Sequence, residues 1–226
     1  MMPIGRVLAK TGITPNMITG LTVIVALVCA WIFYQGDLLL GLAFLILTVV
    51  MDMLDGAVAR AAGLSSKFGA TFDHVLDRYA EYLFMLGLMI GPVGAVAISW
   101  WPYAPDDSFI PWFWGFFTLF GMIMASFTRA KAESVGGMKS CTVGIAERQE
   151  KLLLQIAGIL LLALPPTNIW IDLLTPIPIL LGFFVALEIT NILTLCIVIV
   201  GILSHITVAQ RLLYARKVIL ASELGD

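Results

Sequence analysis

Charged residues are scarce in this sequence of 226 residues: Asp, Glu, Lys and Arg together make up 12%, whereas hydrophobic residues make up 60%. A soluble domain carries about 25% charged residues, so this chain has too little charge to cover a surface in water. Its three cysteines are scattered and its two histidines form no cluster, which argues against a disulfide framework and a zinc site. The net charge of −2 argues against a nucleic-acid partner. An integral membrane protein is the class that fits this composition.

The sequence also contains no internal repeat, no low-complexity segment and no stretch typical of a separate soluble domain. Its first residues, MMPIGRVLAKTGITPN, lack the apolar core of a signal peptide. We therefore expect one membrane domain over residues 1–226. Within residues 1–14, apolar and basic side chains alternate, which predicts a short amphipathic helix on the membrane surface. Residues 15–217 are predicted to form a six-helix bundle.

Long apolar stretches define the predicted spans, because a helix needs about 20 apolar residues to cross a bilayer. Six stretches qualify: about Met17–Tyr34, Leu38–Arg60, Ala70–Trp100, Ile110–Glu133, Glu147–Leu164, and one within residues 177–215. The predicted fold class is therefore all-α, with six transmembrane helices and an interfacial N-terminal helix. With six spans, all 13 Lys and Arg residues fall on one side or at its helix ends. The positive-inside rule makes that side cytoplasmic and places both termini there, in a multi-pass protein of the cell membrane.

Four carboxylates interrupt the apolar pattern at the cytoplasmic ends of the second and third spans. Asp52 and Asp55 are three residues apart, and Asp73 and Asp77 are four apart, so each pair shares one helix face. The short connection between the helices allows the two pairs to converge. Converging carboxylates repel one another, and divalent cations such as Mg²⁺ or Mn²⁺ relieve that repulsion. The spacing therefore predicts a metal site with room for two ions, as in many phosphoryl-transfer enzymes.

Small residues accompany these acids. Gly56 and Ala59 follow the first pair, and Gly69 precedes the second, so a ligand can approach the helix backbone closely. Arg60 offers a planar donor group suited to a phosphate. In a purely structural alternative, the small residues serve helix packing and nearby Lys and Arg side chains neutralise the acids. That alternative explains the glycines, but it does not require the spacing of the acids.

The whole pattern resembles the signature of the CDP-alcohol phosphotransferase family, and it agrees at all eight fixed positions. The agreement reads Asp52-x2-Asp55-Gly56-x2-Ala59-Arg60-x8-Gly69-x3-Asp73-x3-Asp77. Thr14-Pro15-Asn16, just before the first span, is similar to the family's entry motif. The family's six-helix arrangement also corresponds to nearly the whole chain.

The resemblance implies that an alcohol attacks the lipid-side phosphorus of CDP-diacylglycerol or CDP-archaeol and that CMP leaves. It implies Asp77 as the general base. The implied metal ligands are Asp52, Asp55, Asp73 and Asp77. The residues implied to hold the CDP-lipid are Asn16, Asp55, Gly56, Ala59, Arg60, Gly69 and Asp73. Homodimers are common in the family, so a homodimer is one implied arrangement, although the sequence leaves the oligomeric state open.

Residues 126–151, SFTRAKAESVGGMKSCTVGIAERQEK, carry five of the 13 cations. A basic cytoplasmic loop alone accounts for such charges, but a pocket for an anionic acceptor is the functional hypothesis. Its candidate phosphate-binding residues are Arg129, Arg148, Lys139 and Lys131. The segment resembles the family branch that uses inositol 1-phosphate and makes phosphatidylinositol phosphate in bacteria or archaetidylinositol phosphate in archaea.

Two alternatives remain open at this stage. The same reaction with glycerol 3-phosphate also needs a basic pocket for a phosphorylated polyol. A cation-coupled transporter would carry acids near mid-membrane on several helices, usually with an internal repeat. Release of CMP from a CDP-lipid separates the enzyme from the transporter.

Overall fold

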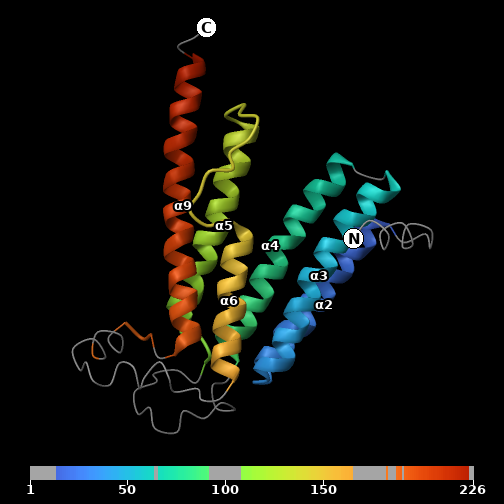
Figure 1. Cartoon of the computed structure of the whole chain (residues 1–226), viewed down its shortest axis with the longest axis vertical. Coiled ribbons are helices and arrows are strands. Elements are labelled where there is room, and N and C mark those ends of the chain that lie inside the picture. Colours follow the sequence, from blue (N-terminus) through green and yellow to red (C-terminus); the bar gives the residue numbers. More distant parts are fainter. Residues whose placement is uncertain are drawn as a thin grey trace. The chain divides into compact units, whose positions relative to one another are not determined.

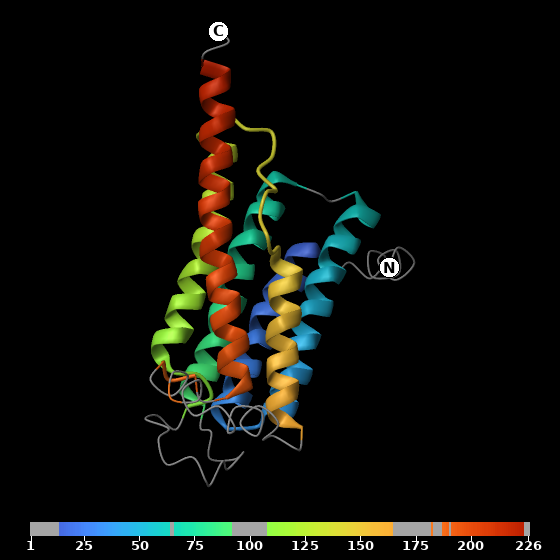
Figure 2. The same cartoon turned by 60° about the vertical axis from the view of Figure 1, so that its left-hand side comes forward.

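A computed structural model describes residues 14–63, 66–91, 108–164, 182, 187–189 and 191–223. The described part of the chain is built from six α-helices, which are drawn as coiled ribbons in Figures 1 and 2. They are α2 (Pro15–Tyr34), α3 (Leu38–Ala62), α4 (Lys67–Ile90), α5 (Trp112–Ser134), α6 (Arg148–Ala163) and α9 (Ile192–Glu223). The all-helical prediction is thus confirmed for the described residues.

Three of these helices, α2, α3 and α9, are long and apolar enough to cross a membrane. The apolar helices agree with a membrane protein, whereas the count of six spans stays a prediction. The predicted interfacial helix of residues 1–14 falls almost entirely outside the described residues, as does most of the chain between 165 and 190.

Short polar residues decide where two of the helices begin. The Asp37 carboxylate accepts a hydrogen bond from the Leu40 amide at 2.9 Å and caps α3. The Ser66 hydroxyl accepts one from the Gly69 amide at 2.9 Å, so α4 starts at Lys67, three residues before the predicted start of the third span. At the other end of α3, Gly63 has a φ of 65°, a left-handed conformation that glycine adopts without a steric penalty.

Helix α9 continues past the predicted end of the bundle at residue 217 and reaches Glu223. No glycine or proline occurs from residue 202 to residue 223, so nothing in the sequence stops the helix earlier. Within its own unit, the C-terminal end of α9 extends beyond α5 (Figures 1 and 2).

The chain forms two compact units, and the first contains α2, α3 and α4. Helix α2 packs against both α3 and α4. The contact with α4 depends on Gly87, because a Cβ added there would lie 2.7 Å from the backbone of Ala30 on α2. Since Ala30 contributes backbone atoms at this point, neither side can move aside cheaply. Gly87 therefore sets the distance between α2 and α4.

We expect Gly87→Ala to lower the thermal midpoint of the purified protein in detergent. Overpacking of this kind costs about 1–3 kcal/mol. Gly20→Ala is the matched control, because a Cβ added to Gly20 on α2 meets nothing within 4 Å. The control should keep or slightly raise the midpoint, since alanine favours a helix by about 0.5–1 kcal/mol over glycine. Equal midpoints for the two variants would contradict the close packing of α2 on α4.

The second unit contains α5, α6 and α9, with α9 packed against both of the others. The buried Thr118 hydroxyl of α5 donates to the Ile197 carbonyl of α9 at 2.8 Å. A Cβ added at Gly201 would meet the same hydroxyl at 2.5 Å, so a small residue is needed where α5 and α9 cross. Threonine and glycine at helix crossings are typical of membrane bundles.

Candidate active site

The four acids predicted from the sequence lie on α3 and α4 within the first unit. Asp55 and Asp77 are buried, and Asp52 and Asp73 are half-buried. One carboxylate oxygen from each of Asp52, Asp55 and Asp73 lies within 4.8 Å of the other two. The structure therefore brings the first pair of acids together with the first acid of the second pair. Three carboxylate oxygens this close form a donor set that suits a hard divalent cation.

A second group of ligand atoms adjoins the first. Asp73, His74 and Asp77 each offer one atom, and these atoms also lie within 4.8 Å of one another. Asp73 belongs to both groups, so two neighbouring ions could share its carboxylate. His74 is exposed on α4, whereas Asp77 is buried one turn further along the helix. The arrangement fits a site for one or two divalent cations.

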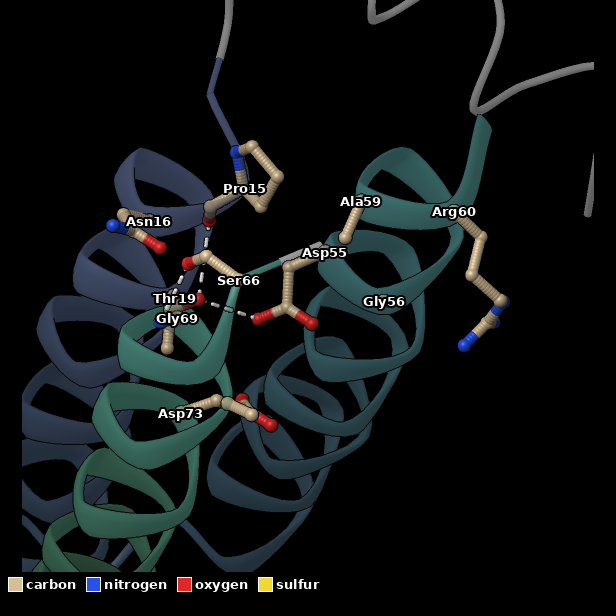
Figure 3. A pocket seen from close by; sticks show the side chains of 11 residues that line it. Pro15, Asn16, Thr19, Asp55, Gly56, Ala59, Arg60, Ser66, Gly69 and Asp73 are labelled. Carbon is tan, nitrogen blue, oxygen red and sulfur yellow. Dashed lines mark hydrogen bonds between the residues drawn. The ribbon is translucent and has the colours of Figure 1, made fainter. Parts of the chain in front are cut away.

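A cavity of about 180 Å³ opens beside these acids, and Figure 3 shows the residues around it. All seven residues that the sequence predicts for the CDP-lipid line this cavity: Asn16, Asp55, Gly56, Ala59, Arg60, Gly69 and Asp73. Four further lining residues are Pro15, Thr19, Ser66 and Ala70. The carboxylates of Asp55 and Asp73 face the space between α3 and α4 (Figure 3).

Two glycines keep this cavity open. A Cβ added to Gly69 would lie 3.0 Å from the Ser66 hydroxyl oxygen and 3.4 Å from the Asn16 amide oxygen. A Cβ added to Gly56 would lie 3.3 Å from a guanidinium nitrogen of Arg60. The guanidinium of Arg60 thus lies beside Gly56, one turn back along α3. Side chains at either glycine would crowd polar groups that border the cavity.

Helix α2 contributes a contact that the sequence pattern did not predict. The Thr19 hydroxyl donates to Oδ2 of Asp55 at 2.8 Å, and the same hydroxyl oxygen lies 3.1 Å from the Pro15 carbonyl oxygen (Figure 3). Thr19 and Asp55 are 6% and 5% exposed, so this bond joins two buried side chains. The site is therefore built from three helices, although the signature occupies only α3 and α4.

The four residues predicted to bind the acceptor phosphate belong to the second unit, and all are exposed: Arg129, Lys131, Lys139 and Arg148. Arg129 forms an ion pair with Glu133, with 3.0 Å between Nε and Oε1. The Lys131 ammonium lies over the Phe127 ring, 5.6 Å from its centroid. Arg129 and Lys131 thus interact with side chains of their own helix.

Two other cations of this unit are buried, and the sequence did not distinguish them. Lys151 is 6% exposed in the first turn of α6, and Arg211 is 8% exposed on α9. Arg211 donates to the Val143 carbonyl at 2.9 Å and to the Ala125 carbonyl at 2.6 Å. It thereby fastens the segment between α5 and α6 to both α5 and α9.

A second hydrogen bond holds the same segment. The Ile145 amide donates to the Gln210 side-chain oxygen at 2.9 Å, next to Arg211 on α9. In the middle of the segment, the Cys141 amide donates to the Glu133 carboxylate of α5 at 3.0 Å. The connection that carries the chain from Arg129 to Arg148 is therefore anchored at several points within its unit.

A family model for CDP-alcohol phosphatidyltransferase matches residues 12–187, which include the whole acidic signature. The chain belongs to this family. It is accordingly an enzyme that transfers a substituted phosphate group, and its apolar helices agree with the membrane-bound synthesis of phospholipids.

Individual relatives agree with the family assignment. The archaetidylinositol phosphate synthase of Pyrococcus horikoshii is 33% identical over 151 residues, which cover 67% of this chain and 71% of that protein. The phosphatidylinositol phosphate synthase PgsA1 of Mycobacterium tuberculosis with CDP-DAG bound is similar in structure, with a TM-score of 0.69 and 26% identity. That match covers 95% of this chain and 92% of the other. PgsA1 in complex with manganese and citrate matches with the same TM-score at 25% identity, over 95% and 88% of the two chains.

Thr19, Ser66 and Arg211 are polar residues near these elements that the sequence pattern did not single out. Thr19 lies in an apolar run, where a threonine is ordinary because its hydroxyl can bond the carbonyl one turn back. Its position three residues after Asn16 is the one available signal, since that spacing puts both on the same face of α2. For Lys151 and Arg211, charge alone could not separate a buried cation from an exposed one.

Proposed function

We propose that this chain transfers a phosphatidyl or archaetidyl group from a CDP-lipid to a hydroxyl of inositol 1-phosphate and releases CMP. The observation that carries the proposal is the convergence of Asp52, Asp55 and Asp73 beside a cavity lined by small residues. Both named relatives above make an inositol phosphate lipid, which supports this acceptor over glycerol 3-phosphate.

In this proposal, Asp52, Asp55, Asp73 and Asp77 would hold Mg²⁺ or Mn²⁺, and we expect two ions because these acids form two adjoining groups of ligand atoms. When bound, the ions offset the negative charge of the bridging phosphates. The manganese-bound structure of PgsA1 agrees with this choice of metal. The donor set agrees as well, because carboxylate oxygens are the ligands that Mg²⁺ and Mn²⁺ prefer.

The CDP group lies against the residues that line the cavity. A volume of about 180 Å³ suits a phosphate-bearing part of the nucleotide rather than the whole lipid. Helices α2 and α4 both begin at the cavity, with Pro15 and Asn16 at one start and Ser66 and Gly69 at the other. Helix N-termini favour anions, and Arg60 adds a cationic donor. These groups would hold the pyrophosphate while the lipid tails remain in the bilayer.

Asp77 is the general base of the proposed reaction. It accepts the proton of the attacking hydroxyl, whose oxygen forms a bond to the lipid-side phosphorus. The bond from that phosphorus to the bridging oxygen breaks, and the electron pair leaves with CMP. Burial of Asp77 at 8% exposure shields the carboxylate from bulk water. The basic side of the membrane is cytoplasmic in this proposal, so a lipid enters sideways and a polar acceptor enters from the cytoplasm.

The basic residues Arg129, Arg148, Lys139 and Lys131 are proposed to hold the acceptor's phosphate. A charge-assisted hydrogen bond is worth about 1.5–3 kcal/mol, and about 1.4 kcal/mol corresponds to a tenfold change. Loss of two such bonds makes free inositol a poor substrate by two or more orders of magnitude. An acceptor panel scored by CMP release, with CDP-diacylglycerol and CDP-archaeol as donors, tests this directly.

Turnover of inositol 1-phosphate far above that of free inositol is the expected result. Equal use of the two would refute the basic pocket, and a clear preference for glycerol 3-phosphate would transfer the assignment to that acceptor. Arg148→Ala should raise the Michaelis constant for inositol 1-phosphate while changing that for the CDP-lipid little. Arg216→Ala is the matched control, because Arg216 is an exposed cation of the same unit on α9.

A further inference from the structure

Thr19 is a buried polar residue on α2 that the acidic signature does not include. Its hydroxyl oxygen lies 2.8 Å from Oδ2 of Asp55 and 3.1 Å from the Pro15 carbonyl oxygen. A hydroxyl has one proton to donate, so the two acceptors compete for it. The bond to an ionised carboxylate is the stronger of the two, because charge-assisted hydrogen bonds are shorter and about twice as strong as neutral ones.

The next threonine of α2 shows what such a residue does without that carboxylate. The Thr22 hydroxyl donates to the Ile18 carbonyl at 2.9 Å, the usual bond to the residue one turn back. Thr22 is 6% exposed, which equals the exposure of Thr19. Thr22 does not line the cavity, whereas Thr19 does. The two residues therefore share helix, burial and backbone bond, and they differ in the contact with Asp55.

We propose that Thr19 is a positioning residue that orients the Asp55 carboxylate for metal binding. The proposal rests on the proposed metal site of this family member. By donating to Oδ2, Thr19 restricts the rotation of the Asp55 carboxylate, which would then be held ready for the ion that this group of acids would bind. Outer partners of this kind orient a ligand before the metal arrives, and their loss typically costs about 10–100-fold in metal affinity or activity.

The packing of the first unit explains why α2 supplies this contact. Helix α2 packs against both α3 and α4, so its residues border the space into which Asp55 and Asp73 point (Figure 3). Gly69 on α4 comes close to Asn16 on α2, and Asp55 on α3 bonds to Thr19 one turn further along α2. The first turns of α2 thus contact both of the helices that carry the acids. Within these turns, Thr19 is the residue that bonds to Asp55, one of the proposed metal ligands.

Direct titration of the purified full-length protein with Mn²⁺ tests the proposal, because it measures binding without catalysis. Thr19→Val keeps the shape and removes the hydroxyl, so Mn²⁺ affinity should fall about 10–100-fold. Thr19→Ser retains the hydroxyl and should stay close to the wild type. Thr22→Val, the matched control, should also stay close to the wild type and keep its CMP release.

Activity assays distinguish loss of metal positioning from general damage to the fold, because they measure how much Mn²⁺ the enzyme needs. For Thr19→Val, the Mn²⁺ concentration needed for half-maximal CMP release should rise, and turnover should recover at saturating Mn²⁺. A damaged fold is not repaired by adding metal, and thermal midpoints of all variants check the fold independently. If Thr19→Val does not fold, Thr19→Ala carries the same expectation with a smaller side chain.

Wild-type affinity for Mn²⁺ in the folded Thr19→Val or Thr19→Ala variant would overturn the proposal, and so would a wild-type protein that binds no Mn²⁺. The proposed function fails separately, if the wild type binds Mn²⁺ but releases no CMP with any acceptor. In that case, a loss of Mn²⁺ affinity in Thr19→Val would still support the positioning role.

Discussion

Asp77→Asn should lower the rate of CMP release by about 10²–10⁴-fold, which is the typical cost of losing one general base. An amide in place of the carboxylate cannot take the proton of the attacking hydroxyl. Asp77 is buried on α4, one turn after Asp73, so the substitution changes charge and proton affinity with little change of volume. The measurement is CMP release at saturating CDP-lipid and inositol 1-phosphate, accompanied by the affinity for the CDP-lipid.

The loss should appear in turnover far more than in CDP-lipid affinity, because other residues line the cavity. Asp37→Asn is the matched control. Asp37 caps the opposite end of α3, and asparagine caps a helix about as well as aspartate. Near-normal turnover in Asp77→Asn would remove Asp77 from the role of base. Equal losses in Asp77→Asn and Asp37→Asn would point to general damage instead.

Removal of divalent cations by a chelator should abolish CMP release, and added Mg²⁺ or Mn²⁺ should restore it. The reason is the short separation of the Asp52, Asp55 and Asp73 oxygens, all within 4.8 Å of one another. Without a cation, these carboxylates repel one another and nothing offsets the charge of the substrate's phosphates. Full activity in thoroughly chelated buffer would exclude a metal-dependent reaction.

The same metal dependence should be visible in stability. An ion that binds only the folded protein stabilises it by about 2.7 kcal/mol at 100 times its dissociation constant. The thermal midpoint should therefore rise with Mn²⁺ in the wild type and in Asp37→Asn. Asp52→Asn should lose most of that rise and bind the CDP-lipid more weakly. A similar rise in Asp52→Asn would show that the stabilising ion binds elsewhere.

The pairing of the acids could be predicted because it depends on short-range geometry. A spacing of three or four residues places two side chains on one face of any helix, so the pairing of Asp52 with Asp55 and of Asp73 with Asp77 follows from the sequence. The limits of α3 are also set locally, by the Asp37 side chain that caps its start and by the left-handed backbone of Gly63 at its end. The sequence by itself also determined the chain's class, since so little charge fits only a membrane protein.

The tertiary structure alone decided which neighbours complete the site. Helical periodicity tells which face a residue occupies, but it does not tell which helix covers that face. Helix α2 packs against both α3 and α4, and this packing brings the Thr19 hydroxyl to Asp55. Likewise, the packing of α9 against α5 and α6 accompanies the burial of Lys151 and Arg211 while Arg129 and Arg148 remain exposed. The contact of Thr19 with Asp55 and that of Arg211 with Ala125 join residues 36 and 86 positions apart in the chain. No local sequence pattern encodes contacts over such separations.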